Sequence, residues 1–198
     1  MTFARSFAVG KFAVTFEEWD ACVADGGCNG YRPGDEGWGR GRRPVIHVKW
    51  DDAQAYVAWL SRKTGKGYRL LSEAEREYVT RAGTTTPFWT GSTISKNQAN
   101  FSTNKTVPVG SFQPNPFGFY QVHGNVLEWT EDCWNGNYNG ALTYGSAWTS
   151  GDCISRVLRG GSWVSGPLGL RAADRYKGTS DFRYSFIGLR VARTLLTP

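Results

Sequence analysis

The first part of the chain combines a strand-like pattern of apolar residues with a helical one. Apolar residues alternate with small or polar ones over 7–16, which predicts a strand. The segment that follows begins with Thr15 and, three residues on, Glu18, the pair that forms a capping box at the start of a helix. The Gly26–Gly27 pair predicts the end of this helix.

Two further helices are predicted before residue 84. A strand-like run over 44–50 leads into an amphipathic segment over 51–65, whose acidic first turn and basic last turn suit the helix dipole. A second capping-box pair, Ser72 and Glu75, begins the third helix, and Gly83 ends it.

Beyond this point the pattern changes to short strand-like pieces separated by Gly, Asn, Pro, Ser and Thr. The pieces are PFWTG, KTVPVGSF, FGFYQV, NVLEWTEDCW and SRVLRGGSW, and none has a helical period. Because helices come early and irregular strands come late, the sequence predicts an α+β fold, as one domain over residues 1–198.

Composition narrows the class of protein. The chain has 198 residues, of which 15% are aromatic and 20% charged, with 25 glycines, and this is typical of a compact, loop-rich globule. Its net charge of +6 is spread along the sequence without a dense Lys/Arg block, so no specific nucleic-acid partner is expected. No apolar run approaches the ~20 residues that a membrane helix needs, and no secretory leader is recognised. The compartment stays open, with the cytoplasm favoured.

The four cysteines form two local pairs in sequence, Cys22 with Cys28 and Cys133 with Cys153. Neither spacing is that of a zinc or thioredoxin-like site. Two disulfides and four buried free thiols both remain open as alternatives.

The C-terminal stretch has two regular ends and an irregular middle. RVLRGGSW (156–163) and IGLRVAR (187–193) alternate apolar residues and are punctuated by glycine, whereas 164–186 follows neither a helical nor a strand period. Arg171, Arg175 and Arg190 recur among small residues, and we expect these side chains to brace loops through hydrogen bonds to carbonyl groups.

These two ends, together with three other segments, resemble the formylglycine-generating-enzyme (sulfatase-modifying factor) family. The segments are PVIHVKWDDAQAYVAWLSRKTG, YRLLSEAEREYVTRAG and FGFYQVHGNVLEWTEDCW, and the resemblance extends over about 7–193. It implies an elaborated C-type-lectin-like fold with short antiparallel strands and much irregular loop.

The oxidase of this family needs two cysteines just after the RGGS segment, where they bind copper and attack the substrate. The corresponding stretch here, WVSGPLGLRAADR, contains no cysteine, so neither oxidase activity nor copper is expected. An iron-dependent branch of the family uses a His-rich site, but this chain has only His47, at an alternating position of the predicted strand, and His123, beside a glycine turn. Both are predicted to be packed or surface imidazoles. We expect no enzymatic activity.

A non-enzymatic branch resembles the chain more closely: the variable proteins of diversity-generating retroelements. These end in RGGSW, a variable patch, LRAA, a second patch and IGFRVA, and the present sequence has this layout with Leu189 in place of Phe. The resemblance implies a ligand-binding protein whose variable region spans 164–186. The predicted ligand-binding positions are Val164, Ser165, Gly166, Leu168, Gly169, Asp174, Tyr176, Lys177, Gly178, Thr179, Phe182, Tyr184, Ser185 and Phe186.

The residue types in this region are those of a binding surface. Tyr176, Phe182, Tyr184 and Phe186 are interspersed with Ser and Gly, as in antibody-like surfaces that combine rigid aromatic anchors with small neighbours. The alternative is that these aromatic side chains complete the core. A variable ligand, expected to be a protein, is predicted to contact the loops, and a fused or associated effector domain is a further expected partner.

The resemblance also implies a structural calcium ion at the turn that precedes the LEW segment. The matching positions are Gln121, Gly124, Val126 and Glu128, whose oxygen ligands would suit a hard cation. The alternative, that Glu128 braces the turn, is equally open. Two other functions also remain open: a divergent family member inactive as an oxidase, and the recognition domain of a larger signalling or defence protein.

Overall fold

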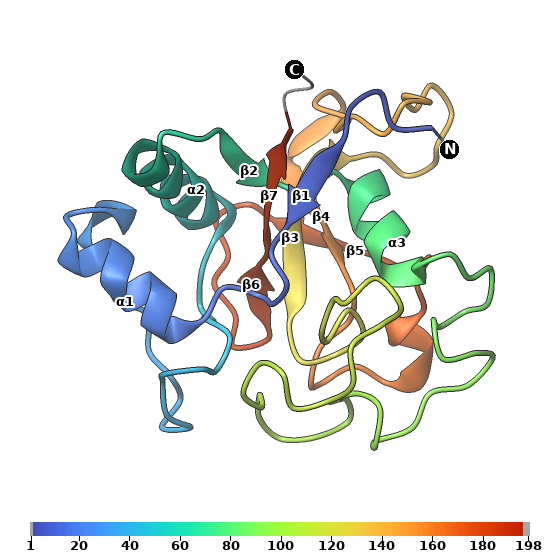
Figure 1. The fold of residues 1–198 in the computed structure, drawn as a ribbon, viewed down its shortest axis with the longest axis horizontal. Coiled ribbons are helices and arrows are strands. Elements are labelled where there is room, and N and C mark those ends of the chain that lie inside the picture. The colour runs from blue at the N-terminus through green and yellow to red at the C-terminus, as the bar shows by residue number, and fades with distance from the viewer. Residues whose placement is uncertain (1, 196–198) are drawn as a thin grey trace.

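The computed structural model describes residues 2–195 and contains three α-helices and seven strands (Figure 1). The helices are α1 (Phe16–Ala24), α2 (Trp50–Thr64) and α3 (Glu73–Arg81). The strands are β1 (Phe7–Val9), β2 (Tyr68–Leu70), β3 (Leu127–Trp134), β4 (Asp152–Arg159), β5 (Arg175–Thr179), β6 (Ile187–Leu189) and β7 (Val191–Thr194), with 3₁₀ turns η1 (Cys28–Gly30) and η2 (Pro167–Leu170).

The strands form two sheets. One has the order β1-β7-β2 and is antiparallel throughout, and the other has the order β5-β4-β3-β6, in which only the β3–β6 pair is parallel. In Figure 1 the helices α1 and α2 lie on one side of the strands and α3 lies on the other. The expected α+β fold with short, mainly antiparallel strands is therefore confirmed.

The helix starts follow from local chemistry. Both predicted capping boxes are present: the Thr15 side chain accepts a hydrogen bond from the Glu18 amide, and Ser72 does the same for Glu75. A left-handed residue, Gly65, ends α2. Each of these helix boundaries depends on residues that are close together in sequence, so the sequence alone can predict it.

The main core lies where α1 and α2 meet the strands. Trp19 and Trp129 are fully buried there, together with Phe16, Ile46 and Leu189. Burial of side chains this large supplies most of the free energy that favours folding.

Several segments differ from what the sequence predicts, among them the pieces PFWTG, KTVPVGSF and FGFYQV, which form no named strand. The strand expected over 7–16 ends at Val9, and the run over 44–50 forms no strand, because its backbone turns at His47, which has a φ of +57°. His47 is accordingly not a strand residue. Conversely, 175–179 is a strand, β5, although its sequence has no strand period; pairing with β4 imposes the conformation.

Both disulfides are formed, between Cys22 and Cys28 and between Cys133 and Cys153. They decide between the two alternatives left open by the sequence. Within residues 2–195 we find no helix with the length and apolar character needed to cross a bilayer.

Candidate binding surface in the C-terminal loops

The predicted ligand-binding positions all belong to the described part of the chain, and none of them is buried. The most exposed side chains include Leu168 at 72%, Val164 at 47%, Phe182 at 46% and Tyr184 at 41%. The exposed positions are Val164, Gly166, Leu168, Lys177, Phe182 and Tyr184, and the half-buried ones are Ser165, Gly169, Asp174, Tyr176, Gly178, Thr179, Ser185 and Phe186.

Three aromatic rings form a continuous row at the exposed end of this region. The ring centroids of Phe182 and Tyr184 are 5.6 Å apart in an edge-to-face arrangement, and those of Tyr184 and Phe186 are 4.9 Å apart and stacked. Phe186 packs against the core, whereas the other two rings extend into solvent. The row therefore presents a large apolar area that is held at its inner end.

The backbone beneath these rings is fixed by residues from other segments. The amide of Trp50 donates to the Ser180 carbonyl at 3.0 Å, and the amide of His47 donates to the Tyr184 carbonyl at 3.0 Å. The Trp163 indole donates to the Ser185 carbonyl at 3.0 Å. All three bonds use main-chain acceptors of the segment, so they do not depend on which side chains the segment carries.

One side chain of the segment points inward and is an exception to this outward display. The Arg183 guanidinium binds both carboxylate oxygens of Asp52, at 2.7 and 2.9 Å, and lies over the Tyr31 ring. Asp52 is buried in the first turn of α2, where it also accepts a hydrogen bond from the Lys49 amide. This carboxylate raises the pKa of Arg183, so the guanidinium stays charged.

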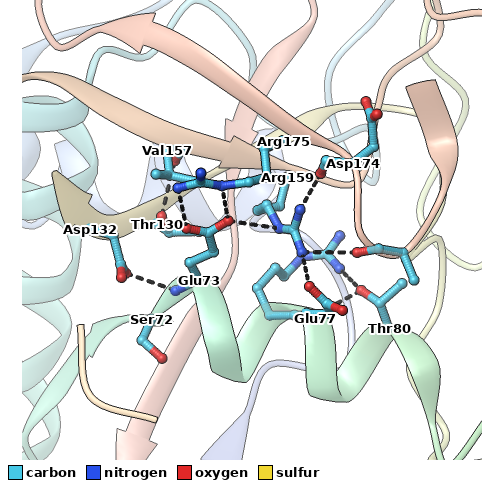
Figure 2. Close-up of polar contacts among 12 residues, drawn as sticks. Ser72, Glu73, Glu77, Thr80, Thr130, Asp132, Val157, Arg159, Asp174 and Arg175 are labelled. Atoms are coloured by element: carbon cyan, nitrogen blue, oxygen red, sulfur yellow. Dashed lines mark hydrogen bonds and ion pairs between the residues drawn. The ribbon is translucent and has the colours of Figure 1, made fainter. Parts of the chain in front are cut away.

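A buried charge network supports β5 from below (Figure 2). Glu73 of α3 accepts two hydrogen bonds from Arg175, at 2.6 and 2.8 Å. Arg159 of β4 lies beside it and donates to the carbonyls of Ala172 and Asp174. These contacts fix the backbone of the LRAADR segment (170–175) itself, and they confirm that Arg175 is a bracing residue that also binds a carbonyl, that of Asn135.

The two patches meet at Tyr176. Its hydroxyl lies close to Ser165 and Gly169; an added Cβ at Gly169 would be 2.1 Å from the tyrosine oxygen. Below them, the His123 ring binds the Leu170 carbonyl at 2.6 Å and accepts a hydrogen bond from the Trp89 amide. Positions 164–169 and 174–186 therefore form one continuous surface, and His123 is a packed imidazole, as predicted.

Gly178 does not fit the role of a replaceable position. A Cβ there would lie 2.6 Å from Leu158 and 2.8 Å from the Trp129 ring, and both of these side chains are buried. We therefore assign Gly178 to the scaffold. Its neighbour Lys177, by contrast, is exposed and pairs with Asp152 at 2.9 Å on the surface.

The residues of the implied calcium site do not fit a calcium ion. Glu128 is fully buried, and its oxygens accept hydrogen bonds from Arg76 at 2.6 Å and from Arg190 at 2.9 Å. Burial alone would raise the pKa of Glu128, but the two guanidiniums hold it below its usual value. A second cation beside two arginines would be repelled, and the geometry matches the alternative in which Glu128 braces the turn.

The other three positions would supply backbone carbonyl oxygens, and their side chains or Cα atoms have packing roles of their own. The Gln121 side chain accepts from the Gly110 amide and donates to the Pro108 carbonyl, both at 3.2 Å. Gly124 packs against the Asn100 backbone so closely that a Cβ would be 2.4 Å from its oxygen, and the Val126 side chain lies in the core.

Sequence reasoning missed the residues that complete the site from outside. Asp52 and His47 hold the loop, and the Trp38 ring packs edge-on against Trp163, a residue of the RGGSW frame, with centroids 5.3 Å apart. Ile154, 74% exposed on β4, lies beside the segment and accepts a hydrogen bond from the Ser180 amide. No local pattern marks Asp52, His47, Trp38 or Ile154, because each lies outside 164–186 in sequence.

Sequence comparison finds a family model and several named relatives that are similar to this chain. A family model, the sulfatase-modifying factor enzyme 1-like domain, matches residues 1–195. Serine/threonine-protein kinase pkn1 of Chlamydia caviae is 36% identical over 158 residues, which cover 78% of this chain and 25% of that protein. Formylglycine-generating enzyme of Mus musculus is 34% identical, with coverage of 77% and 45%, and the mouse inactive C-alpha-formylglycine-generating enzyme 2 is 32% identical, with coverage of 78% and 50%. The chain thus spans a quarter to about half the length of these curated relatives.

Solved structures give the same picture at the level of the fold. PvdO from Pseudomonas aeruginosa superposes with a TM-score of 0.89 at 40% identity, covering 98% of this chain and 83% of that one. Treponema denticola variable protein 1 superposes with a TM-score of 0.80 at 26% identity, covering 96% and 84%. The P3c variant of the major tropism determinant, at 16% identity, a TM-score of 0.55 and coverage of 95% and 50%, shows the fold alone. The fold is C-type-lectin-like, and the resemblance to variable proteins of the retroelement type is confirmed.

Proposed function

The chain belongs to the sulfatase-modifying factor enzyme 1-like family, and within that family we propose that it is a ligand-binding protein whose C-terminal loops form a replaceable binding surface. The observation that carries the proposal is that different groups of the 174–186 segment have different roles. Main-chain groups and Arg183 are bound by other segments, while Phe182 and Tyr184 point into solvent. A loop held in this way keeps its shape when its outward side chains change.

The surface fits a protein ligand best. Its exposed aromatic row is flanked by small residues, the combination that gives adaptable protein contacts at low entropic cost. Likeness to Treponema denticola variable protein 1 supports the same proposal.

An oxidase function is the second candidate, because the relatives include formylglycine-generating enzyme. Its chemistry requires a thiolate, and here all four cysteines are paired as disulfides, with none in 163–175. We therefore propose that this protein is not an oxidase. Incubation with a sulfatase-type cysteine peptide, copper and oxygen should yield no formylglycine by mass spectrometry. Formation of formylglycine would refute the proposal that the protein is not an oxidase.

The disulfides also bear on location. Such bonds persist in oxidising compartments and are rare in the cytosol. We propose that the protein works in an oxidising compartment, contrary to the expectation of a cytoplasmic protein that the sequence suggested.

The decisive experiment replaces the outward side chains together. A variant with serine at Val164, Leu168, Phe182 and Tyr184 should keep its far-UV circular dichroism and cooperative melting, since these side chains are exposed. A library randomised at the same positions and displayed on phage should yield binders to an arbitrary protein such as hen lysozyme. The matched control is randomisation at four exposed positions outside the surface, Glu17, Ala24, Arg62 and Lys63. Binders of equal frequency in both libraries, or a loop variant that fails to fold, would contradict the proposal.

A further inference from the structure

We propose that the groove between the β1-β7-β2 sheet and the helices α1 and α2 is a second binding site, for a small carboxylate with an apolar body. The groove has a volume of about 600 Å³, within the range of small-molecule sites. Its lining residues come from α1, α2, β1, β2, β7 and the turns beside them, and it shares no residue with the C-terminal binding surface. The inference therefore does not rest on the proposed function.

Small side chains leave the space open. In the sheet register Arg193 of the central strand β7 lies between Ala8 of β1 and Tyr68 of β2. Ala21 of α1 and Gly10 also line the groove, while larger side chains such as Phe12, Trp59 and Tyr68 form its walls. The small residues leave an open groove between the helices and the strands.

The charge of the groove is positive and uncompensated. Arg193 is half-buried on a central strand, and Lys66 reaches the same groove, yet neither forms an ion pair within residues 2–195. Glu18 is the acidic residue of the lining, and its carboxylate is already bound by the Thr15 amide at 2.7 Å and the Thr15 hydroxyl at 2.8 Å. A partly buried guanidinium without a carboxylate is costly unless an anion approaches it.

A tyrosine hydroxyl is available at the same groove. Tyr56 of α2 is only 4% exposed as a residue and lines the groove, and no described residue forms a hydrogen bond with its hydroxyl, which is therefore open to the groove. Burial raises the pKa of this phenol, and the nearby Glu18 and Tyr68 raise it further, so the hydroxyl keeps its proton and remains a donor. An acceptor oxygen from a ligand would satisfy it.

The side chains that line the groove indicate that the ligand has an apolar part besides its carboxylate. Leu60, Val14 and Val191 give the lining apolar surface beside its cationic residues, Lys11, Lys66 and Arg193. A hydrated inorganic anion would leave these walls in contact with water, whereas an alkyl or aryl carboxylate would cover them and place its charge at Arg193. The class of ligand is therefore a monocarboxylate with an aliphatic or aromatic chain.

Isothermal titration calorimetry with decanoate tests the site, and methyl decanoate is the neutral counterpart. We expect saturable binding of decanoate, at least about tenfold weaker binding by Arg193→Gln, and unchanged binding by the matched control Arg62→Gln, whose residue is exposed on α2 outside the groove. Methyl decanoate should bind wild type and Arg193→Gln equally weakly.

A second variant protects the test against misfolding. Ala21 is exposed, so Ala21→Trp should fold and should abolish decanoate binding by filling the groove. The variant with four serines in the C-terminal loops should bind decanoate like wild type, which separates this site from the binding surface. Equal decanoate binding by wild type and Arg193→Gln, methyl decanoate binding as tight as that of decanoate, or no binding at about 1 mM ligand would overturn the proposal.

Discussion

Arg183 and Asp52 are 131 positions apart in sequence, yet they form a two-point ion pair with distances of 2.7 and 2.9 Å. The pair joins the tip of the C-terminal loop to the first turn of α2. Because the Trp50 amide at the start of that helix also donates to the Ser180 carbonyl, the helix and the loop support each other. The shape of the binding surface therefore depends on a helix at the other end of the sequence.

Breaking this pair should destabilise the fold more than removing a surface pair. Arg183→Gln leaves the buried Asp52 carboxylate without its charged partner, and we expect a loss of about 1–3 kcal/mol in the free energy of unfolding. The control is Lys177→Gln, whose pair with Asp152 is solvent-exposed and should contribute about 0–1 kcal/mol. Urea denaturation measures both, and equal small losses would contradict the anchoring role of Arg183.

Helix starts were predictable from sequence because their determinants are local. The Thr15–Glu18 and Ser72–Glu75 capping boxes span three residues each, and both are present in the structure. The strand predicted over 44–50 was wrong because His47 takes a left-handed conformation, and its amide binds the Tyr184 carbonyl across the fold. Strand β5 was missed because a long-range contact also determines its conformation, namely its pairing with β4.

The location of the binding loops could be predicted from the sequence, but the contacts that hold these loops in place could not. The family resemblance located the loops, and the structure shows that their predicted positions are not buried. Gly178 was included because it lies in the region that the resemblance marks as variable, whereas the closeness of Trp129 and Leu158 appears only when β5 is packed on β4. Tertiary contacts of this kind leave no local pattern.

Positions 169 and 176 should be coupled in any diversified set. Gly169→Ala brings a Cβ to the place of the Tyr176 hydroxyl, so we expect it to destabilise wild type while being tolerated in a Tyr176→Ala background. A double-mutant cycle should give a coupling of about 0.5–3 kcal/mol. Gly166→Ala is the control, since a Cβ there meets nothing within 4 Å. If the effects of the two substitutions on unfolding free energy are additive, the Tyr176 hydroxyl moves away from the new Cβ of Ala at position 169 and the two positions are not coupled.

Gly178 should resist replacement in every background. Gly178→Val forces a branched side chain against the buried Trp129 ring, and we expect a loss of about 1–3 kcal/mol or more in unfolding free energy. The exposed neighbour Lys177→Val is the control for the strand itself. A Gly178→Val variant as stable as wild type would return this position to the replaceable set.

Calcium should have no effect on stability if Glu128 braces the turn. Its carboxylate is bound between Arg76 and Arg190, so adding calcium or removing it with a chelator should leave the melting temperature unchanged to within about 1 °C. Glu128→Gln should cost about 3–5 kcal/mol, because two buried guanidiniums lose their counter-charge. A calcium-dependent rise in melting temperature that Glu128→Gln abolishes would instead support the metal site.

Stability should fall in acid through His123, and the sign follows from its contacts. Burial lowers the pKa of His123 from 6.5 to about 4, and the neutral ring accepts a hydrogen bond from Trp89. As the pH falls below 6.5, His123 becomes protonated in the unfolded chain but stays neutral in the folded protein. The unfolding free energy therefore drops by up to about 3 kcal/mol between pH 6.5 and 4.

Asp132 acts in the opposite direction over the same range, so the wild-type curve alone would not reveal His123. Burial raises the pKa of Asp132 to about 6, although its carboxylate accepts a hydrogen bond from the Glu73 amide (Figure 2). As the pH falls, the folded state therefore takes up a proton at Asp132 before the unfolded state does. The difference between wild type and His123→Gln cancels the contribution of Asp132. We expect His123→Gln to be less stable than wild type at pH 7, with the gap narrowing by about 2–3 kcal/mol at pH 4. A gap that stays constant with pH in urea denaturation would mean that the folded protein protonates His123 freely.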